Sequence, residues 1–357
     1  MKWKKKLLAV LLVMGMVWAL ASTSYAYSLA PSATSCCVID VDSGRILYQS
    51  NENAKRPIAS ITKIMTGLLG CELNDQEDFD TVITVSKNAA AEDGSSMYLE
   101  AGDKILLESA LYGTMLRSGN DAAMVVAEYT AGDEASFLEL MNEKAKELGM
   151  TNTHFSCPNG LVDENNYSTA HDMALLGCYA MQNEHFAEIV KTVSIKTEDG
   201  YTIENHNRLL SEDERCIGIK TGWTTLAGRT LVSCFEDPDS GQRVVCCTLN
   251  DPNDFNEHID VHNWAFQNYP KRTFCEKNQV VTHVTLAGST VSVPLVAEET
   301  VSYPLSNAET NQVTCSLELP DHATTLSEQD VVGQAVYYFK GKEIGRTNLY
   351  ADYSAED

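Results

Sequence analysis

Basic residues are scarce in this chain of 357 residues, and several familiar cysteine motifs are missing from it. Lysine and arginine number 26 against 50 acidic residues, which gives a formal net charge of −24. A chain with this balance does not attract nucleic acid or an anionic membrane through its net field. There is no C-x-x-C sequence, so the spacing of the eleven cysteines indicates neither a zinc site nor a redox motif. We expect most of these cysteines to be buried thiols, although one or two disulfides are compatible with the sequence.

Long apolar runs are also rare, and the clearest one lies at the N-terminus. Four lysines precede the apolar segment Leu7 to Leu20, and Ser24-Tyr25-Ala26 resembles a cleavage site for signal peptidase. We therefore expect residues 1–26 to be a secretory signal peptide. A retained anchor is the alternative, but the run is short for a membrane-spanning helix. Cleavage leaves 22 basic and 50 acidic residues, a net charge of 22 − 50 = −28.

The pattern of the remaining chain changes near residue 275. Up to that point, segments with helical and strand character are mixed, which predicts an α/β (α+β) fold whose first and last strands are neighbours. The predicted strands are 37–40, 45–48, 82–85, 216–220, 229–236 and 243–250, and the predicted helices are 60–71, 106–117, 121–129, 137–148, 169–182 and 255–269. From about Glu276 short β-type runs are separated by Gly and Pro, which indicates a small all-β domain.

Ser60 and Lys63 form the first pair of residues that indicates chemistry. They lie three positions apart before an apolar helical segment, so both side chains are expected on one face of the helix start. The free N–H groups and the dipole at a helix start favour negative charge, which suits a serine that becomes an alkoxide. The lysine acts as a base only when it is neutral, which requires burial or a second cation nearby.

Two further triplets follow in the chain, and together with the first pair they form a specific set. Ser118-Gly119-Asn120 lies in a predicted loop between helices, and Lys220-Thr221-Gly222 is expected at the end of a strand before a hairpin. An S-x-x-K, an S-x-N and a K-T-G sequence, in this order, are used by active-site serine enzymes that react with penicillin.

With these motifs, the chain resembles the low-molecular-weight penicillin-binding proteins, which are D-alanyl-D-alanine carboxypeptidases of the serine peptidase class. The resemblance extends from about Ser35 to the C-terminus. It implies a DD-peptidase-like (penicilloyl-serine transferase) antiparallel sheet with a helical cluster in a catalytic domain at 27–275, and a small all-β domain at 276–357. Other segments that carry the resemblance are Arg56 to Ser60, Ser118 to Ala123, Asn159-Gly160-Leu161, Ser168 to Ala174 and Ala227-Gly228-Arg229.

The resemblance also implies the catalytic residues. Ser60 would attack the carbonyl group of the penultimate D-alanine of a peptidoglycan stem peptide and become acylated. Lys63 would remove the proton of Ser60, and Ser118 would relay a proton between Lys63 and the leaving amine. Water would then hydrolyse the acyl-enzyme, and β-lactam antibiotics would react with the same serine.

The substrate-binding residues follow from the same resemblance. Asn120 would bind the substrate backbone, and Lys220 would help to keep Lys63 neutral while it attracts the terminal carboxylate. Thr221 and Gly222 belong to the same motif, with Thr221 expected to bind that carboxylate. The backbone N–H groups of Ser60 and Trp223 would form an oxyanion hole. No metal and no organic cofactor are implied.

One position departs from the family pattern. Family members often carry an arginine ten residues before the aromatic residue of the closing helix, and counting back from Trp264 this position is Asp254. Arg229, on the strand beside K-T-G, is the candidate replacement as a ligand for the substrate carboxylate. An ordinary strand cation is the competing interpretation of Arg229.

Several histidines and the enzyme class allow other interpretations. His258 and His262 are spaced like a metal pair but lack the Glu of H-E-x-x-H, which favours a plain helix surface. His171 is expected to pack or hydrogen-bond rather than act as a base. A β-lactamase is disfavoured, because no Glu-x-x-Leu-Asn segment lies between Asn120 and Lys220 and the β domain is foreign to that class. A D,D-endopeptidase of the same fold and a catalytically idle wall-binding scaffold remain as alternatives.

The expected location is outside the cytoplasm, in the cell-wall zone. The residues after Tyr350 carry three acids and no apolar face, so the sequence predicts that there is no C-terminal membrane anchor.

Overall fold

The structure is a computed structural model that describes residues 29, 31–161, 164–286, 290–320, 325–326, 330–352 and 355–356. The expected signal peptide at 1–26 lies outside the described residues, and so do parts of the segment after Tyr350.

A five-stranded antiparallel sheet forms the frame of the N-terminal part. Its strands run in the order β2 (Ile46–Ser50), β1 (Ser35–Asp40), β11 (Arg243–Leu249), β10 (Gly228–Glu236) and β9 (Cys216–Thr224). Strand β1 pairs with β11, so that Cys37 lies opposite Cys247. The prediction that the first and last strands are neighbours is therefore confirmed. Because β9 is the outermost strand of this order, one of its edges is available to a ligand site.

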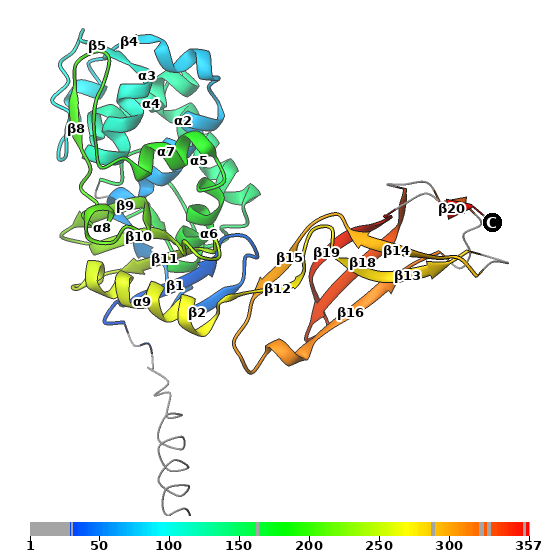
Figure 1. Cartoon of the computed structure of the whole chain (residues 1–357). Helices are drawn as coiled ribbons and strands as arrows, with labels where there is room; N and C mark the ends of the chain where they lie inside the picture. Colours follow the sequence, from blue (N-terminus) through cyan, green and yellow to red (C-terminus); the bar gives the residue numbers. More distant parts are fainter. Residues whose placement is uncertain are drawn as a thin grey trace, which may run out of the picture. The chain divides into compact units, whose positions relative to one another are not determined.

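Helices cover both faces of this sheet (Figure 1). Helix α9 (Asp254–Asn268) packs on β10 and β11, and α6 (Ala170–Ala180) packs on β1 and β11 from the other face. Behind α6 lies a helical cluster, whose members are α2 (Lys63–Glu72), α3 (Leu107–Tyr112), α4 (Asn120–Ala131), α5 (Glu134–Glu147) and α7 (Glu184–Lys191). Asp133 caps α5 by accepting a hydrogen bond from the Ser136 N–H group.

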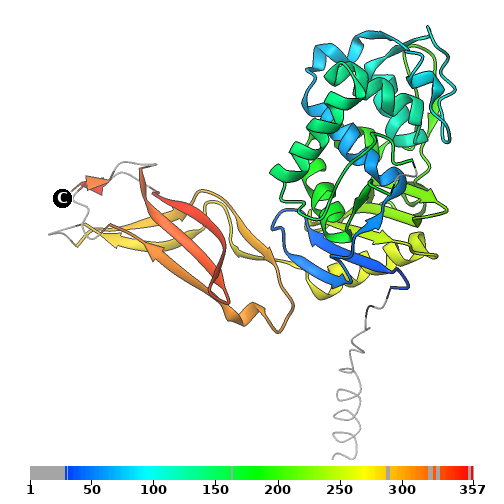
Figure 2. The same ribbon diagram turned by 180° about the vertical axis from the view of Figure 1, so that it is seen from behind.

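Helix α2 runs through the helical cluster, where it contacts α4, α5, α6 and α7 (Figure 2). Nine of its ten residues are buried. The sequence predicts one helix from Ser60 onward, but Ala59–Thr62 form a 3-10 turn (η1) and the α-helix begins at Lys63. Ser60 thus lies in the tighter turn that leads into α2.

Several short elements were not predicted or have shifted bounds. The predicted helix 106–117 is α3 followed by a π-type turn, η4 (Gly113–Arg117), and the predicted strand 82–85 is β4 (Val82–Thr84). Helix α7 and the strands at 194–196 and 202–204 were not predicted. The helix is amphipathic, with Phe186, Ile189 and Val190 buried, but it has only eight residues, and each of the two strands has three. The other short elements are β3 (Arg56–Pro57), η2 (Gln76–Asp80), η3 (Ala89–Ala91), β5 (Lys104–Leu106), β6 (Tyr167–Ser168), β7 (Ser194–Lys196), β8 (Thr202–Glu204) and α8 (Leu209–Glu212).

The C-terminal part is rich in strands, as predicted. A five-stranded antiparallel sheet has the order β13 (Val280–Thr285), β14 (Ser292–Ala297), β19 (Lys342–Ala351), β18 (Val331–Phe339) and β16 (Val313–Glu318). Its apolar side packs around Val293, Leu295 and Leu349. The smaller elements are β12 (Lys271–Cys275), β15 (Val301–Pro304), η5 (Thr310–Gln312), β17 (Thr325–Leu326) and β20 (Ala355–Glu356). The boundary at residue 275 stays a prediction.

All eleven cysteines lie in the described residues and are present as thiols, and nine of them are buried. This confirms the expectation that most of the cysteines are buried thiols. Among the described residues, no helix combines the length and the apolar character needed to cross a membrane.

Candidate active site

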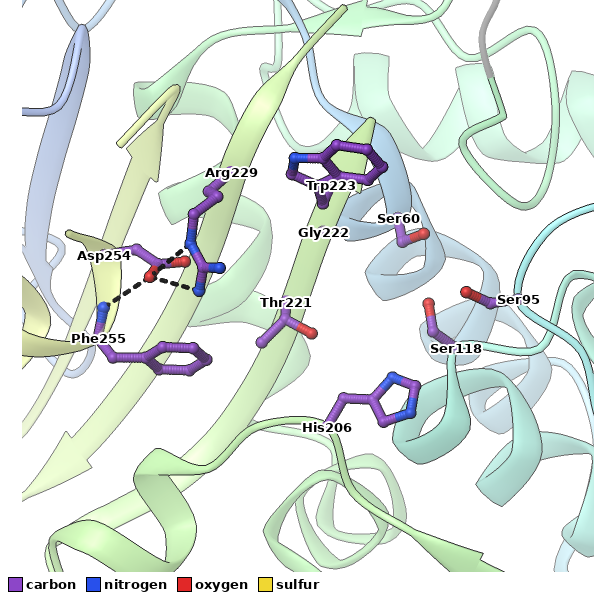
Figure 3. Close-up of a pocket in the computed structure, with 10 residues that line it drawn as sticks. All are labelled: Ser60, Ser95, Ser118, His206, Thr221, Gly222, Trp223, Arg229, Asp254 and Phe255. Carbon is purple, nitrogen blue, oxygen red and sulfur yellow. Dashed lines mark hydrogen bonds and ion pairs between the residues drawn. The ribbon is translucent and has the colours of Figure 1, made fainter. Parts of the chain in front are cut away.

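A pocket of about 330 Å³ lies where strand β9 meets the 3-10 turn η1 and the loop before α4 (Figure 3). It brings together residues from all three sequence motifs, which are far apart along the chain. The residues that line it are Ser60, Ser95, Ser118, His206, Thr221, Gly222, Trp223, Arg229, Asp254 and Phe255.

Ser60 and Lys63 meet at the start of α2. Lys63 Nζ lies 3.3 Å from Ser60 Oγ, 2.7 Å from Asn120 Oδ1 and 2.6 Å from the carbonyl oxygen of Asn159. The backbone is strained just before the nucleophile, because Ala59 has a φ of 52°, in the left-handed region that disfavours residues with a Cβ atom. The turn is thus held by its surroundings rather than by local preference.

Burial controls the protonation of the two lysines. Lys63 is fully buried, and this burial lowers its pKa well below the ordinary value, with a further decrease from the charge of Lys220. Burial also lowers the pKa of Lys220, to about 7. Burial therefore favours the neutral form of both amines, and the charge of Lys220 favours it further at Lys63.

Asn120 and Ser118 lie at the start of α4, on the opposite side of the pocket from β9. Asn120 accepts a hydrogen bond from Lys63 at Oδ1 and donates through Nδ2 to the carbonyl oxygen of Asp93, which fixes the orientation of its amide. Ser118 adopts a left-handed φ of 64°, and its buried Oγ has no hydrogen-bond partner among the described residues. A buried hydroxyl that lines a pocket without a partner is suited to bind a ligand.

Asp121 holds the loop that carries Ser95 against the site. Its carboxylate accepts hydrogen bonds from the backbone N–H groups of Met97 and Leu99 and from the hydroxyl of Ser96. The backbone N–H of Asn120 also donates to the carbonyl oxygen of Ser95. The residue after the S-x-N motif therefore shapes this wall of the pocket.

The K-T-G sequence lies inside β9, which continues to Thr224, rather than at the end of the strand as predicted. Lys220 Nζ donates to the carbonyl oxygen of Thr221 at 3.0 Å. Gly222 is required by close packing, since a Cβ atom there would lie 2.5 Å from Thr230 Oγ1 and 3.0 Å from the backbone nitrogen of Ser60. Trp223 is 65 % exposed at the rim.

Arg229 lies opposite Trp223 in the pairing of β10 with β9, but its side chain is not isolated. Arg229 Nε and Nη2 donate to the same oxygen, Oδ1, of Asp254 at 3.0 and 2.8 Å. From the sequence, Asp254 occupies the position of the family arginine, and Arg229 is the predicted replacement. In the structure the two residues form one ion pair that lines the pocket (Figure 3).

Two contacts of the site were not predicted as functional. The carbonyl oxygen of Asn159 accepts a hydrogen bond from Lys63 Nζ. The side-chain Nδ2 of Asn159 donates to Glu92 Oε2 at 2.6 Å. Gly160 has a φ of +80°, and a Cβ atom there would lie 2.0 Å from the carbonyl oxygen of Ala59. The sequence Asn159-Gly160-Leu161 carries the family resemblance, which was the available signal for this loop.

Ser95, Phe255 and His206 also line the pocket and were not predicted. Burial and the charges of Lys220 and Arg117 lower the pKa of His206. It has no motif around it that marks it in the sequence.

The expectation that His258 and His262 lie on a helix surface is wrong. Both imidazoles are completely buried between α9 and the sheet, where Ser233 Oγ lies 2.6 Å from His258 Nδ1 and 2.9 Å from His262 Nε2. The physical reason is that this face of α9 packs on β10 and β11, and Ser233 and Thr248 supply polar partners there. His171 hydrogen-bonds Asp172, as expected.

Comparison with known proteins agrees with this geometry. A family model described as D-alanyl-D-alanine carboxypeptidase (peptidase S11) matches residues 22–253, and one described as penicillin-binding protein 5, C-terminal domain, matches residues 269–356. The chain is 30 % identical to D-alanyl-D-alanine carboxypeptidase DacF of Bacillus subtilis over 98 % of this chain and 91 % of the relative. It is 32 % identical to D-alanyl-D-alanine carboxypeptidase DacC of Escherichia coli over 92 % of this chain and 86 % of the relative.

The fold is similar to that of a solved structure as well. Penicillin-binding protein 5 from Haemophilus influenzae superposes with a TM-score of 0.72 at 27 % identity, over 92 % of this chain and 98 % of that chain. The chain therefore belongs to the S11 family of serine-type D-alanyl-D-alanine carboxypeptidases.

Proposed function

We propose that this protein removes the terminal D-alanine from peptidoglycan stem pentapeptides through an acyl-enzyme on Ser60, and that β-lactams acylate the same serine. The site of action is outside the cytoplasm, in the cell-wall zone. The observation that carries the proposal is the environment of Lys63, whose amine is fully buried, close to a second lysine and 3.3 Å from Ser60 Oγ.

A neutral amine can make all three contacts of Lys63. Such an amine has two N–H groups and one lone pair, and two of its three neighbours, Asn120 Oδ1 and the carbonyl oxygen of Asn159, can only accept. These two acceptors take both N–H groups, which leaves the lone pair for the O–H group of Ser60. Lys63 is therefore prepared to take the proton of Ser60 before substrate binds.

The reaction proceeds in two stages. Ser60 Oγ bonds to the carbonyl carbon of the penultimate D-alanine while its proton moves to Lys63 Nζ. The backbone N–H groups of Ser60 and Trp223 stabilise the oxyanion that forms. The C–N bond then breaks, and the departing nitrogen takes a proton that Ser118 relays from Lys63. Water attacks the resulting ester and releases the shortened peptide and free Ser60.

Substrate binding uses the remaining residues of the pocket. Asn120 hydrogen-bonds the peptide backbone. Lys220 provides the positive charge beside Thr221, and Thr221 and Arg229 bind the terminal carboxylate. The carboxylate requires a cation or several donors once it leaves water. A change of Arg229 to Ala should therefore weaken peptide turnover and penicillin acylation by tens-fold or more, since the loss of a hydrogen-bonded charge partner costs about 2–5 kcal/mol.

The direct test is covalent labelling with a fluorescent penicillin and detection of free D-alanine from a pentapeptide by mass spectrometry. We expect wild-type protein to be labelled at Ser60 and to release D-alanine. Ser60→Ala should do neither while keeping its thermal stability, because a hydroxyl in a surface pocket contributes little to folding. Undiminished labelling of the Ser60→Ala protein would refute the proposal, and a wild-type protein that is not labelled would support the idle scaffold instead.

A further inference from the structure

Arg229 is held by its neighbours in a defined orientation. A guanidinium group has five N–H bonds, one on Nε and two on each Nη nitrogen. Asp254 Oδ1 accepts one bond from Nε and one from Nη2, which occupies the side edge of the group. Three N–H bonds remain, two on Nη1 and one on Nη2, and one bond from each of these nitrogens lies along the outer edge. Within the described part of the chain, Nη1 has no hydrogen-bond partner, and the arginine side chain is 44 % exposed.

Asp254 is in turn fixed by the first residues of α9. Its Oδ1 also accepts the backbone N–H of Phe255 at 2.9 Å, and its side chain is only 5 % exposed. A carboxylate at a helix start is stabilised by the positive end of the helix dipole. The ring of Phe255 lies 5.2 Å from Arg229 Cζ, so the same residue fixes the carboxylate through its backbone and covers the guanidinium with its ring.

The charges in the pocket assign different tasks to the two cations. Arg229 and Asp254 compensate each other, which leaves Lys220 as the uncompensated positive charge beside Thr221. A free carboxylate is therefore attracted mainly by Lys220. The outer edge of Arg229 offers it two parallel N–H bonds, from Nη1 and Nη2, and this geometry determines its orientation.

We propose that Asp254 is a positioning residue that turns the outer edge of Arg229 into the pocket and thereby makes the site selective for a peptide with a free terminal carboxylate. This inference rests on the proposed function. In the view of Figure 3 the guanidinium lies on the Thr221 side of Asp254, as this task requires. Asp254 acts only through Arg229 and does not touch the substrate.

The test measures binding without turnover. In a Ser60→Ala background, calorimetry gives the dissociation constants of a soluble peptide ending in D-Ala-D-Ala, as the free acid and as the C-terminal amide. Asp254→Ala frees the Arg229 side chain, which must then be ordered again when the peptide binds. The dissociation constant of the acid should therefore rise about three- to tenfold. That of the amide should stay the same. Asp254→Asn keeps an acceptor oxygen and should bind the acid at least as tightly as the parent protein.

A matched control is available on the same aromatic ring. Arg208 Cζ lies 4.3 Å from the centre of the Phe255 ring, and Arg208 forms an ion pair with Glu212. Glu212→Ala therefore removes the carboxylate partner of the second arginine that contacts this ring. We expect it to leave the ratio of acid to amide binding unchanged. Equal binding of the acid by Asp254→Ala and Asp254→Asn would overturn the inference. The only effect of Asp254 would then be its negative charge, and not the orientation of Arg229. A Tm decrease in Asp254→Ala with an unchanged acid-to-amide ratio would overturn it too, and would assign Asp254 a purely structural role.

Failure of the proposed function gives different results. If Arg229→Ala leaves the acid-to-amide ratio intact, then Arg229 is not the carboxylate ligand. If wild-type Ser60 is not labelled by penicillin, then the reaction itself is wrong. If Ser60 is labelled and Arg229→Ala changes the acid-to-amide ratio, but Asp254→Ala and Asp254→Asn bind the acid equally, then only the positioning role of Asp254 is refuted.

Discussion

At the scale of single residues, the protonation of Lys63 is the property on which the proposed chemistry depends. Burial lowers its pKa first, and the charge of Lys220 lowers it further. Lys63 acts as a base only in its neutral form, so acylation should fall as the pH decreases through the pKa of Lys63. The pH profile of acylation therefore reports the electrostatics of this residue directly.

Lys220→Met tests the contribution of the second lysine. The change removes the positive charge that disfavours protonation of Lys63, so the pKa of Lys63 should rise. The acidic limb of the acylation rate should then shift to higher pH, in addition to a general loss of rate from weaker carboxylate binding. Stopped-flow measurement of penicillin acylation between pH 5 and 9 provides the profile. The exposed Lys191, changed to Met, is the control, and an unshifted acidic limb in Lys220→Met would contradict the assigned coupling.

At the scale of elements, the site depends on close contact between β9 and the turn η1. Gly222→Ala would place a Cβ atom 2.5 Å from Thr230 Oγ1 and 3.0 Å from the backbone nitrogen of Ser60. We expect the strand and the turn to separate, and a displacement of about 1 Å costs roughly 10²-fold in rate. Acylation kinetics and thermal unfolding measure the two effects separately.

Gly70→Ala is the matched overpacking control for this prediction. Gly70 lies in helix α2, which follows the turn η1, and a Cβ atom there would meet Leu111 Cδ2 at 2.7 Å, away from the pocket. It should lower the free energy of unfolding by about 1–3 kcal/mol and leave acylation near the wild-type rate. If both glycine variants lose acylation equally, then the defect in Gly222→Ala comes from general destabilisation and not from the contact with Ser60.

The packing of α9 on the sheet should make the protein sensitive to acid. Burial lowers the pKa of His258 to about 3 and the pKa of His262 well below 6.5. Between pH 6.5 and about 3 the unfolded chain binds protons that the folded chain does not bind. The free energy of unfolding should therefore decrease as the pH falls through this window, by at most about 1.4 kcal/mol per pH unit for each histidine that stays neutral in the folded protein. Above pH 6.5 the two histidines should contribute no pH dependence.

Calorimetric unfolding between pH 4 and 8 checks this prediction. His258→Gln with His262→Gln should flatten the slope below pH 6.5 even if the variant is less stable at pH 8, because the slope and the absolute stability are separate readouts. His283→Gln changes an exposed histidine and is the control. A steep slope that persists in the double variant would mean that other groups cause the acid sensitivity.

At the scale of the whole molecule, the burial of the cysteines predicts low thiol reactivity. Burial raises the pKa of Cys71 and of Cys216 to about 12, and it raises the pKa of Cys37, Cys178 and Cys234 as well. The reactive form of cysteine is the thiolate, so these groups should be inert in the folded protein. Cys315 is the exposed cysteine.

A titration with a chromogenic disulfide reagent checks this prediction. The native protein should show about one fast-reacting thiol, and the denatured protein all eleven. Cys315→Ser should remove the fast phase, while Cys71→Ser should leave it unchanged. Several fast-reacting thiols in the native protein would show that the buried cysteines are accessible through opening of the fold.

The sequence alone determined the reaction class and most of the secondary structure. The three motifs carry their own chemistry in residue type and spacing, and the pairing of β1 with β11 followed from two apolar strand patterns at opposite ends of the catalytic part. The β-rich C-terminal part was predicted from its regular turn residues. These features depend on local pattern, which the order of residues contains directly.

Only the tertiary structure decided which groups meet. Asn159 binds Lys63 from 96 positions away, Asp254 pairs with Arg229, and His258 and His262 are buried because their helix face packs on Ser233. The start of α2 as a 3-10 turn at Ser60 is also a tertiary result, because neighbouring segments hold Ala59 in a conformation that its own preference disfavours. Burial and distance set both the pKa of Lys63 and the orientation of Arg229, and neither quantity is a property of a sequence pattern.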